Sequence, residues 1–218
     1  MPAARPKALS AAIIRERLSG TRMPDDPLAV DLSHMGQRFP DSLSRRLAGN
    51  LRPAGVLIPI IERSDSLAVL LTERAADLRH HAGQVSFPGG GMEAHDADIM
   101  TTALRETHEE VGIAPHEVDI AGYLEPTATI TGFAVTPVIG FVSQSIELRV
   151  DPEEVERAFE VPLDFLMDRR NEEYSEREYG GAKFPVVTFH FAGHRIWGAT
   201  AGIIVTLRRR LLEDIKNR

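Results

Sequence analysis

The most informative stretch of the sequence runs from Phe87 to Ile113 and reads FPGGGMEAHDADIMTTALRETHEEVGI. Within it, Asp98 has the side chain of a helix N-cap, and Gly112 is the residue type that most often ends a helix. These two residues predict a helix over residues 98–111. Residues three and four positions apart give this helix one apolar face. That face consists of Ile99, Met100, Ala103, Leu104, Thr107 and Val111.

Three glutamates lie on the opposite face of the predicted helix. Glu106, Glu109 and Glu110 are spaced at i, i+3 and i+4, so their carboxylates converge within little more than one turn. Each like-charge pair at this spacing costs about 0.2–0.5 kcal/mol, and the C-terminal end of a helix favours cations instead. Converging carboxylates are what hard divalent cations such as Mg²⁺ or Mn²⁺ require. A solvated acidic face shows the same spacing, so the helix alone leaves both interpretations open.

A glycine triplet precedes the helix and follows a short apolar stretch. Gly89, Gly90 and Gly91 allow the backbone to approach a bound ligand more closely than residues with a side chain would. On its own, such a triplet is more often a simple turn.

Composition places the chain among ordinary globular proteins and excludes several chemistries. Of its 218 residues, 25 are Lys or Arg and 32 are Asp or Glu, which gives a net charge of −7. The absence of cysteine excludes disulfides, thiolate metal sites and a cysteine nucleophile. Net acidity argues against a nucleic-acid partner, because binding phosphates by broad attraction needs basic residues.

Hydropathy gives no reason to expect a membrane partner. The longest apolar stretch, residues 54–61, is well short of the roughly 20 residues that span a bilayer. No signal peptide is recognised near the N-terminus. We therefore expect a cytoplasmic location.

The chain divides into two parts. Residues 1–50 are typical of an adapter segment, with an amphipathic helix over residues 8–18, a loop with several prolines and a short helix over residues 41–48. Residues 51–218 are typical of one domain in which strands and helices are interspersed, which predicts an α/β or α+β fold with one mixed sheet. Strands are predicted at residues 55–61, 67–72, 84–87, 118–124, 135–142, 157–161 and 186–191. Further helices are predicted at residues 163–168 and 199–215, and a charged loop at residues 169–181.

The glycine and glutamate stretch resembles the signature of the Nudix hydrolase family, G-x5-E-x7-R-E-U-x-E-E-x-G-U, where U is an aliphatic residue. The matching positions are Gly91, Arg105, Glu106, Glu109, Glu110, Gly112 and Ile113. Two positions depart from the pattern: Ala97 stands where the first Glu belongs, and Thr107 replaces an aliphatic residue. If the loop carries one extra residue, Gly90 is the leading glycine and Asp96 takes the place of that Glu. We favour this register.

A second pattern lies directly upstream, over residues 70–90. It reads Leu70-Leu71-Thr72-x-Arg74-Ala75-x3-Arg79-x3-Gly83-x3-Phe87-Pro88-Gly89-Gly90 and is similar to the additional signature of the coenzyme A diphosphatase branch of the family. Residues 132–138 and 196–201 also look like that branch. The resemblance implies an α/β/α sandwich, a divalent metal cofactor and a small-molecule substrate that is cleaved at its diphosphate linkage. It also implies a homodimer, with which the amphipathic residues 8–18 agree.

The resemblance assigns roles to single residues. The metal, Mg²⁺ or Mn²⁺, is expected on Glu106, Glu109 and Glu110, with Arg105 holding these carboxylates in position. Glu109 and Arg105 are therefore the candidate catalytic residues. The candidates for binding substrate are Arg74, Arg79, Gly89, Gly90 and Gly91. For the two arginines, a surface salt bridge or simple solvation is an equally good interpretation.

Three functions fit these patterns. The first is hydrolysis of coenzyme A, or of acyl-coenzyme A, to 4′-phosphopantetheine and adenosine 3′,5′-bisphosphate. The second is hydrolysis of another nucleoside diphosphate derivative, such as ADP-ribose or NADH. The third is a Nudix-like binding module without catalysis. Such a module is expected to have lost the metal-binding glutamates. Glu106, Glu109 and Glu110 are all present in this sequence, so this function is disfavoured.

Other polar and aromatic residues receive structural interpretations. We expect His80 and His81 in a loop or on the surface, Trp197 in the core, and the basic residues 208–210 in solvent near the end of their helix. A general base could lie among the acidic residues of the predicted loop 169–181. These are Glu172, Glu173, Glu176 and Glu178.

Overall fold

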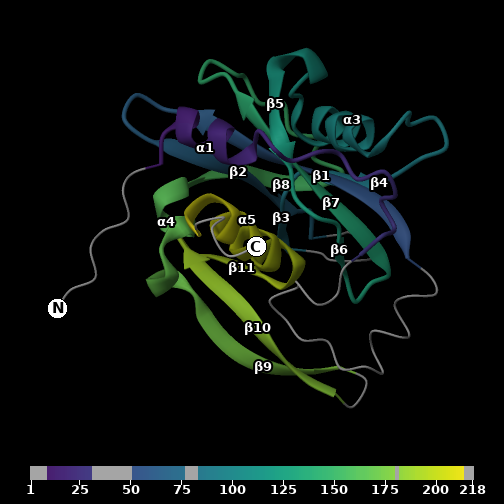
Figure 1. The fold of residues 1–218 in the computed structure, drawn as a ribbon, viewed down its shortest axis with the longest axis vertical. Helices are drawn as coiled ribbons and strands as arrows, with labels where there is room; N and C mark the ends of the chain where they lie inside the picture. The colour runs from purple at the N-terminus through teal and green to yellow at the C-terminus, as the bar shows by residue number, and fades with distance from the viewer. Residues whose placement is uncertain (1–8, 31–50, 77–82, 180–181, 214–218) are drawn as a thin grey trace.

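The computed structural model describes residues 9–30, 51–76, 83–179 and 182–213, which are drawn in colour in Figure 1. The predicted helix over residues 41–48 lies outside the described residues, as do Arg79, His80 and His81. Among the described residues, no helix combines the length and the apolar character that a membrane span requires.

The main sheet is mixed and is built around one long strand. This strand, β1 (Arg52–Glu62), runs parallel to β7 (Phe133–Val142) and antiparallel to β2 (Leu67–Arg74). The path β3-β2-β1-β7-β5 is completed by β3 (Val85–Ser86) and β5 (Val118–Tyr123). Three further strands pair with members of this path: β4 (Gly89–Gly91) with β1, β6 (Thr127–Ala128) with β7, and β8 (Val155–Pro162) with β2.

The alternation of side chains along β1 explains why both faces of this sheet are covered. Leu57 points to one face and packs with Ala103 of α3 (Ile99–Val111). Ile58 and Ile60 point to the other face, into the larger core that includes α1 (Ala11–Leu18) and α5 (Gly198–Leu212). In Figure 1, α3 lies above the sheet and α5 below it. The predicted α+β sandwich with a mixed sheet is therefore confirmed.

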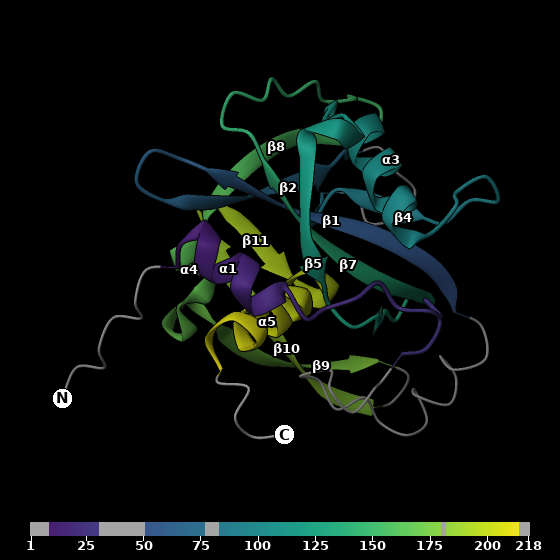
Figure 2. The same ribbon diagram turned by 45° about the horizontal axis from the view of Figure 1, so that its top comes forward.

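Helix α1 packs against its own chain rather than standing apart from it. Its Ile14 and Leu18 are fully buried, and the helix contacts β5 and α5, beside which it lies in Figure 2. Directly after the helix, Thr21 accepts a hydrogen bond from the backbone N–H of Tyr123 at 2.9 Å. The apolar face of α1 is thus covered by other elements of the same chain. The predicted division into two parts at residue 50 stays a prediction.

A second, smaller sheet contains the segment for which we predicted a charged loop. The segment instead forms the 3-10 turn η2 (Arg169–Asn171) and the strand β9 (Glu173–Tyr179), so that prediction is wrong. Strand β9 pairs antiparallel with β10 (Ala182–Phe191), which pairs in turn with β11 (His194–Trp197). An edge strand with exposed side chains needs no apolar alternation, which is why the charged sequence concealed it.

The remaining elements join the two sheets and turn the chain after α3. Helix α4 (Leu163–Met167) follows β8 directly and packs against α5. The 3-10 turn η1 (Pro115–Glu117) leads from α3 into β5. Together with α5, helix α4 ties the smaller sheet to the main one.

The prediction that residues 208–210 face solvent is wrong for Arg208. Its side chain is buried in α5, and its Nε lies 2.8 Å from Oε1 of Glu172, whose side chain is equally buried. The angles of this contact are not those of a hydrogen bond, so the pair is held by charge and close packing. Packing of the second sheet against α5 turned one arginine of a basic run inward.

Candidate active site

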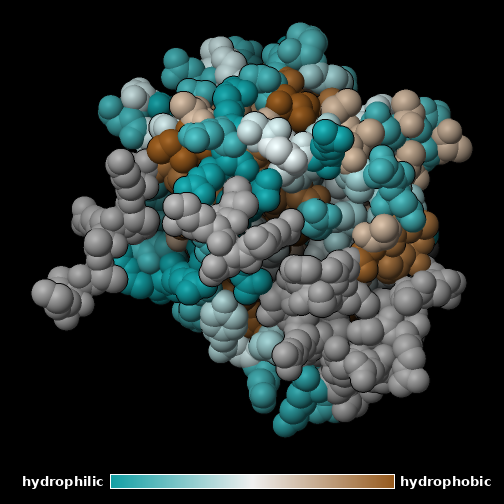
Figure 3. Space-filling view, viewed as in Figure 1, coloured by the Kyte–Doolittle hydropathy of each residue, from teal (hydrophilic) through white to brown (hydrophobic). Residues whose placement is uncertain are grey.

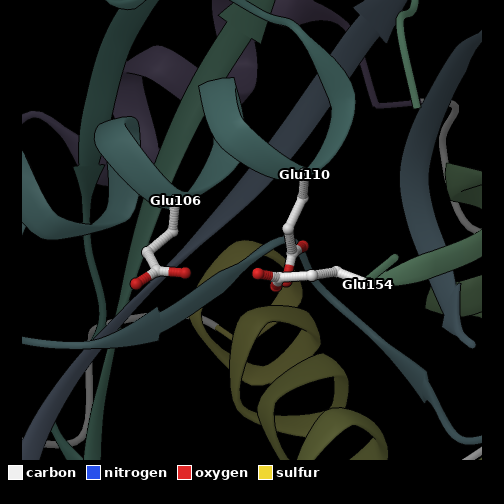
Figure 4. A group of neighbouring side chains, drawn as sticks. All are labelled: Glu106, Glu110 and Glu154. Atoms are coloured by element: carbon white, nitrogen blue, oxygen red, sulfur yellow. The ribbon is translucent and has the colours of Figure 1, made fainter. Parts of the chain in front are cut away.

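Three glutamates from two separate elements form an acidic cluster. Glu106 and Glu110 project from α3, and Glu154 precedes β8. One carboxylate oxygen from each lies within 4.8 Å of the others, and Figure 4 shows the three side chains converging. This spacing would allow one divalent cation to contact all three residues.

The end of helix α3 determines where Glu154 lies. Gly112 ends the helix with a φ of 78°, a conformation that glycine adopts without strain. The chain returns across this end, where the N–H of Arg149 donates to the carbonyl of Val111 and that of Asp151 to the carbonyl of Glu110. These bonds satisfy carbonyls that the helix leaves free, and they bring Glu154 to Glu110.

Glu154 was missed by sequence reasoning. It belongs to an acidic stretch, residues 151–154, that has the composition of an ordinary surface turn. The one relevant indication was that this stretch lies shortly before the strand predicted at residues 157–161. Its partner in space is the end of a helix far away in sequence, which only the folded chain reveals.

Glu110 is the most strongly perturbed member of the cluster. Its side chain is 1% exposed, and burial raises its pKa to about 8. Two groups favour its charged form: the Arg74 guanidinium at 3.5 Å and the N–H of Gly89, which donates a hydrogen bond at 3.4 Å. Both contacts are long, so they compensate the buried charge only in part. Burial also raises the pKa of Glu106, and a divalent cation would compensate both carboxylates.

Arg105 connects the cluster to a buried aspartate. Its Nε and Nη2 donate to the two oxygens of Asp96 at 2.9 and 3.0 Å, while its Nη1 donates to Glu106 at 2.9 Å. Asp96 also accepts from the hydroxyl of Thr102 and from the N–H of Glu93. The Arg105 guanidinium holds the pKa of Asp96 well below its usual range. Arg105 therefore connects Asp96 to Glu106 through charge-assisted hydrogen bonds, and its positioning or catalytic role stays a prediction.

Glu109 lies beside the cluster rather than within it. Its carboxylate accepts from Nη1 of Arg105 at 2.8 Å, and its side chain is 54% exposed. Of the three predicted metal ligands, the structure groups Glu106 and Glu110 with Glu154, whereas Glu109 shares Arg105 with Glu106. A metal-binding or catalytic role of Glu109 stays a prediction.

The glycine triplet forms strand β4 and lies against the glutamates. A Cβ atom on Gly90 would come within 2.4 Å of the carboxyl carbon of Glu106, so the missing side chain is what allows this carboxylate its position. Gly89 contacts Glu110 through its N–H. Substrate binding by Gly89, Gly90 and Gly91 stays a prediction.

Replacing Gly90 with Ala should weaken metal binding without unfolding the protein. The added Cβ displaces the flexible end of Glu106, and disturbing such a supporting contact typically costs 10–100-fold in metal affinity or activity. We expect about a tenfold rise in the dissociation constant for Mn²⁺, measured by titration calorimetry, with little change in melting temperature. Gly202→Ala in α5 is the control, because nothing lies within 4 Å of its added Cβ. Equal Mn²⁺ affinity in the two variants would contradict the proposed contact.

Trp197 and the acidic residues of the segment predicted as a charged loop lie outside the glutamate cluster. Trp197 is only half-buried, and the guanidinium of Arg195 lies 4.9 Å from its ring centroid, so its placement in the core is wrong in part. Glu172 pairs with Arg208, whereas Glu173, Glu176 and Glu178 are exposed on β9. None of these acidic residues belongs to the cluster formed by the described residues.

A mixed sheet lies between helices, and a glutamate cluster formed by one helix and a distant loop lies beside a glycine strand. This is the arrangement of a hydrolase that acts on pyrophosphate bonds. The family profile described as the NUDIX domain matches residues 51–179. The chain therefore belongs to the Nudix hydrolase family, whose members typically use divalent metal ions.

Curated relatives cover most of the chain. One from Photorhabdus laumondii, named uncharacterized Nudix hydrolase NudL, is 39% identical over 185 residues, which are 84% of this chain and 98% of that one. A protein of the same name from Cronobacter sakazakii is 38% identical over 193 residues, covering 88% of this chain and 99% of that one. Among solved structures, a MutT/nudix family protein from Enterococcus faecalis has a TM-score of 0.49 at 13% identity, covering 97% of this chain and 78% of that one.

Proposed function

We propose that this Nudix hydrolase cleaves coenzyme A, or acyl-coenzyme A, within its diphosphate to give 4′-phosphopantetheine and adenosine 3′,5′-bisphosphate. One observation carries the proposal: residues 70–90, which are similar to the coenzyme A diphosphatase signature, reach the glutamate cluster at two points. Arg74 lies 3.5 Å from Glu110, and the N–H of Gly89 donates to the same carboxylate. The signature therefore supplies neighbours of the cluster rather than remote surface residues.

The chemistry of the cluster supports this reaction class. Mg²⁺ or Mn²⁺ held by Glu106, Glu110 and Glu154, with Glu109 as the further predicted ligand, would neutralise the diphosphate and lower the pKa of a bound water. Hydrolysis adds water across one P–O bond of the diphosphate, so one product phosphate takes the hydroxyl and the other leaves. Arg74, at the rim of the cluster, has the planar guanidinium that suits a phosphate oxygen.

The alternative substrates are other nucleoside diphosphate derivatives, such as ADP-ribose and NADH. They share the diphosphate, and the cluster alone does not distinguish them. A binding module without catalysis is disfavoured because Glu106, Glu109 and Glu110 are all present and two of them converge with Glu154.

Product analysis tests this proposal directly. With Mn²⁺ or Mg²⁺, the purified protein should convert coenzyme A to 4′-phosphopantetheine and adenosine 3′,5′-bisphosphate, as measured by chromatography and mass spectrometry. We expect kcat/KM for coenzyme A to exceed that for ADP-ribose and for NADH by at least about tenfold, which corresponds to about 1.4 kcal/mol of transition-state binding. Faster cleavage of ADP-ribose or NADH would refute the substrate assignment while leaving the diphosphate chemistry intact.

The homodimer also stays a proposal. The apolar face of α1 is covered by β5 and α5 of the same chain, so this helix no longer supports it. On the face seen in Figure 3, apolar side chains of the described residues form separate patches rather than one continuous surface. The family resemblance is the remaining support, and the mass in solution decides the question.

A further inference from the structure

A cavity is lined by residues other than the three clustered glutamates. It is an open cavity of about 670 Å³, lined by the ends of β2 and β8, by β3 and by the turn and strand that follow β10. Cavities of a few hundred to about 1,000 Å³ are typical of sites for small molecules. This cavity is therefore large enough for a substantial part of a nucleotide derivative.

Positive charge predominates among the side chains that line the cavity. Arg157 and Arg195 contribute cations, and Glu73 is the carboxylate among the lining residues, paired with Arg157. Glu73 has a second neighbour, because Nδ1 of His194 lies 3.0 Å from the same oxygen that Arg157 approaches at 3.5 Å. The Glu73 carboxylate thus contacts both Arg157 and His194, and Arg195 adds a further positive charge to the lining. Such an excess of positive charge favours an anionic ligand, in a chain whose net charge is −7.

The cavity wall is ordered by packing. The ring of His194 is stacked on that of Phe159 at 3.8 Å, which fixes the imidazole beside Glu73. The guanidinium of Arg195 lies 4.9 Å from the ring centroid of Trp197, so the aromatic ring orients this cation. A guanidinium that is already oriented loses less side-chain entropy when it binds a phosphate.

The backbone adds to the preference for an anion. Trp197 also lines the cavity, and it is the N-cap of α5 without a side-chain hydrogen bond to the first turn of the helix. Helix α5 therefore begins next to the cavity, and the N-terminal end of a helix carries partial positive charge.

One strand links this cavity to the glutamate cluster. Glu73 and Arg74 are consecutive in β2, so their Cα atoms are about 3.8 Å apart and their side chains point to opposite faces. Arg74 contacts Glu110, whereas Glu73 lines the cavity. The cluster and the cavity therefore share the C-terminal end of β2, with the cluster on one face of the strand and the cavity on the other.

We propose that this cavity binds a phosphomonoester that the substrate carries in addition to its diphosphate, with Arg157 and Arg195 as the cationic contacts. The inference rests on the proposed function, because coenzyme A has such a group on its ribose, whereas ADP-ribose and NADH do not. The phosphomonoester is therefore the group by which the protein would distinguish coenzyme A from ADP-ribose and NADH. The diphosphate would be bound through the divalent cation that Glu106, Glu110 and Glu154 would hold, while the phosphomonoester would be bound in the cavity.

Calorimetry on the full chain without metal tests the cavity independently of catalysis. The probes are adenosine 3′,5′-bisphosphate and adenosine 5′-monophosphate. The wild-type protein should bind the bisphosphate at least about tenfold more tightly, the usual effect of one charge-assisted contact. Arg157→Gln and Arg195→Gln should each lower affinity for the bisphosphate by about tenfold and leave the monophosphate unchanged. Arg169→Gln, at an exposed arginine outside the cavity, is the control and should change neither.

Equal binding of the two nucleotides by the wild-type protein, or an unchanged preference in both cavity variants, would overturn the inference. Turnover separates this failure from failure of the proposed function. Equal kcat/KM for coenzyme A and dephospho-coenzyme A would refute the cavity while the diphosphatase assignment stands. No cleavage of either compound, with the calorimetric preference intact, would refute the assignment while supporting the cavity.

Discussion

Glu110→Gln is expected to lower kcat by about a thousandfold, which corresponds to about 4 kcal/mol of transition-state stabilisation. Glu110 is the most buried member of the cluster, and its carboxylate lies with those of Glu106 and Glu154. Gln keeps the size and one oxygen but removes the charge that would hold a divalent cation. Glu106→Gln should have a comparable effect. Steady-state turnover with saturating Mn²⁺ measures both losses.

The same Glu110→Gln substitution should not destabilise the metal-free protein. Burial raises the pKa of Glu110 to about 8, compared with an ordinary value of 4.5. Between these two values the folded state keeps a proton that the unfolded state has released, so the free energy of unfolding falls as the pH rises through this range. The variant lacks this titration. Without metal it should match the wild type at low pH and melt a few degrees higher at about pH 9.

Thermal unfolding in EDTA at several pH values separates the two effects. Glu62→Gln, at an exposed position at the end of β1, is the matched control and should alter neither turnover nor the pH dependence of melting. Full activity of both cluster variants would show that these glutamates do not form the metal site. A large loss of stability in the variants would show that the loss of activity reflects unfolding.

The elements that could be predicted are those whose burial pattern is regular. Strand β1 is a short continuous apolar run and helix α3 carries apolar residues at helical spacing, and both were found with errors of a few residues at their ends. Strands β4 and β6 are too short for a pattern, and β9 is charged along its length. Their pairing is determined by the neighbouring strand rather than by their own composition.

The candidate site could be predicted only where it is local in sequence. Glu106 and Glu110 share one helix, so their spacing alone brings them together. Glu154 arrives through the tertiary contacts of residues 149–151 with the end of that helix. Glu110 lies on the face opposite the apolar residues, as we expected, but it is buried there, with Arg74 and Gly89 against its carboxylate. Helical spacing identifies neighbours but not which of them the rest of the fold will cover.

Arg208 is another residue whose burial the sequence did not predict, and its replacement is expected to have the largest effect on stability. Arg208→Met should lower the free energy of unfolding by about 3–5 kcal/mol, because it leaves the buried carboxylate of Glu172 without its cation. Tyr174 donates to the other oxygen of Glu172 at 2.7 Å and cannot neutralise the charge. Denaturant unfolding monitored by circular dichroism measures the change.

Two further variants test whether the loss of stability comes from the unpaired charge of Glu172. Glu172→Met combined with Arg208→Met should recover most of the lost stability, since a buried ion pair replaced by apolar groups of similar size is often neutral. Arg169→Met, which breaks the exposed pair of Arg169 with Glu213 at 3.4 Å, should cost less than about 1 kcal/mol. If the double variant is as unstable as Arg208→Met alone, the arginine stabilises α5 through packing of its aliphatic stem, and the charge of Glu172 is not what the fold must compensate.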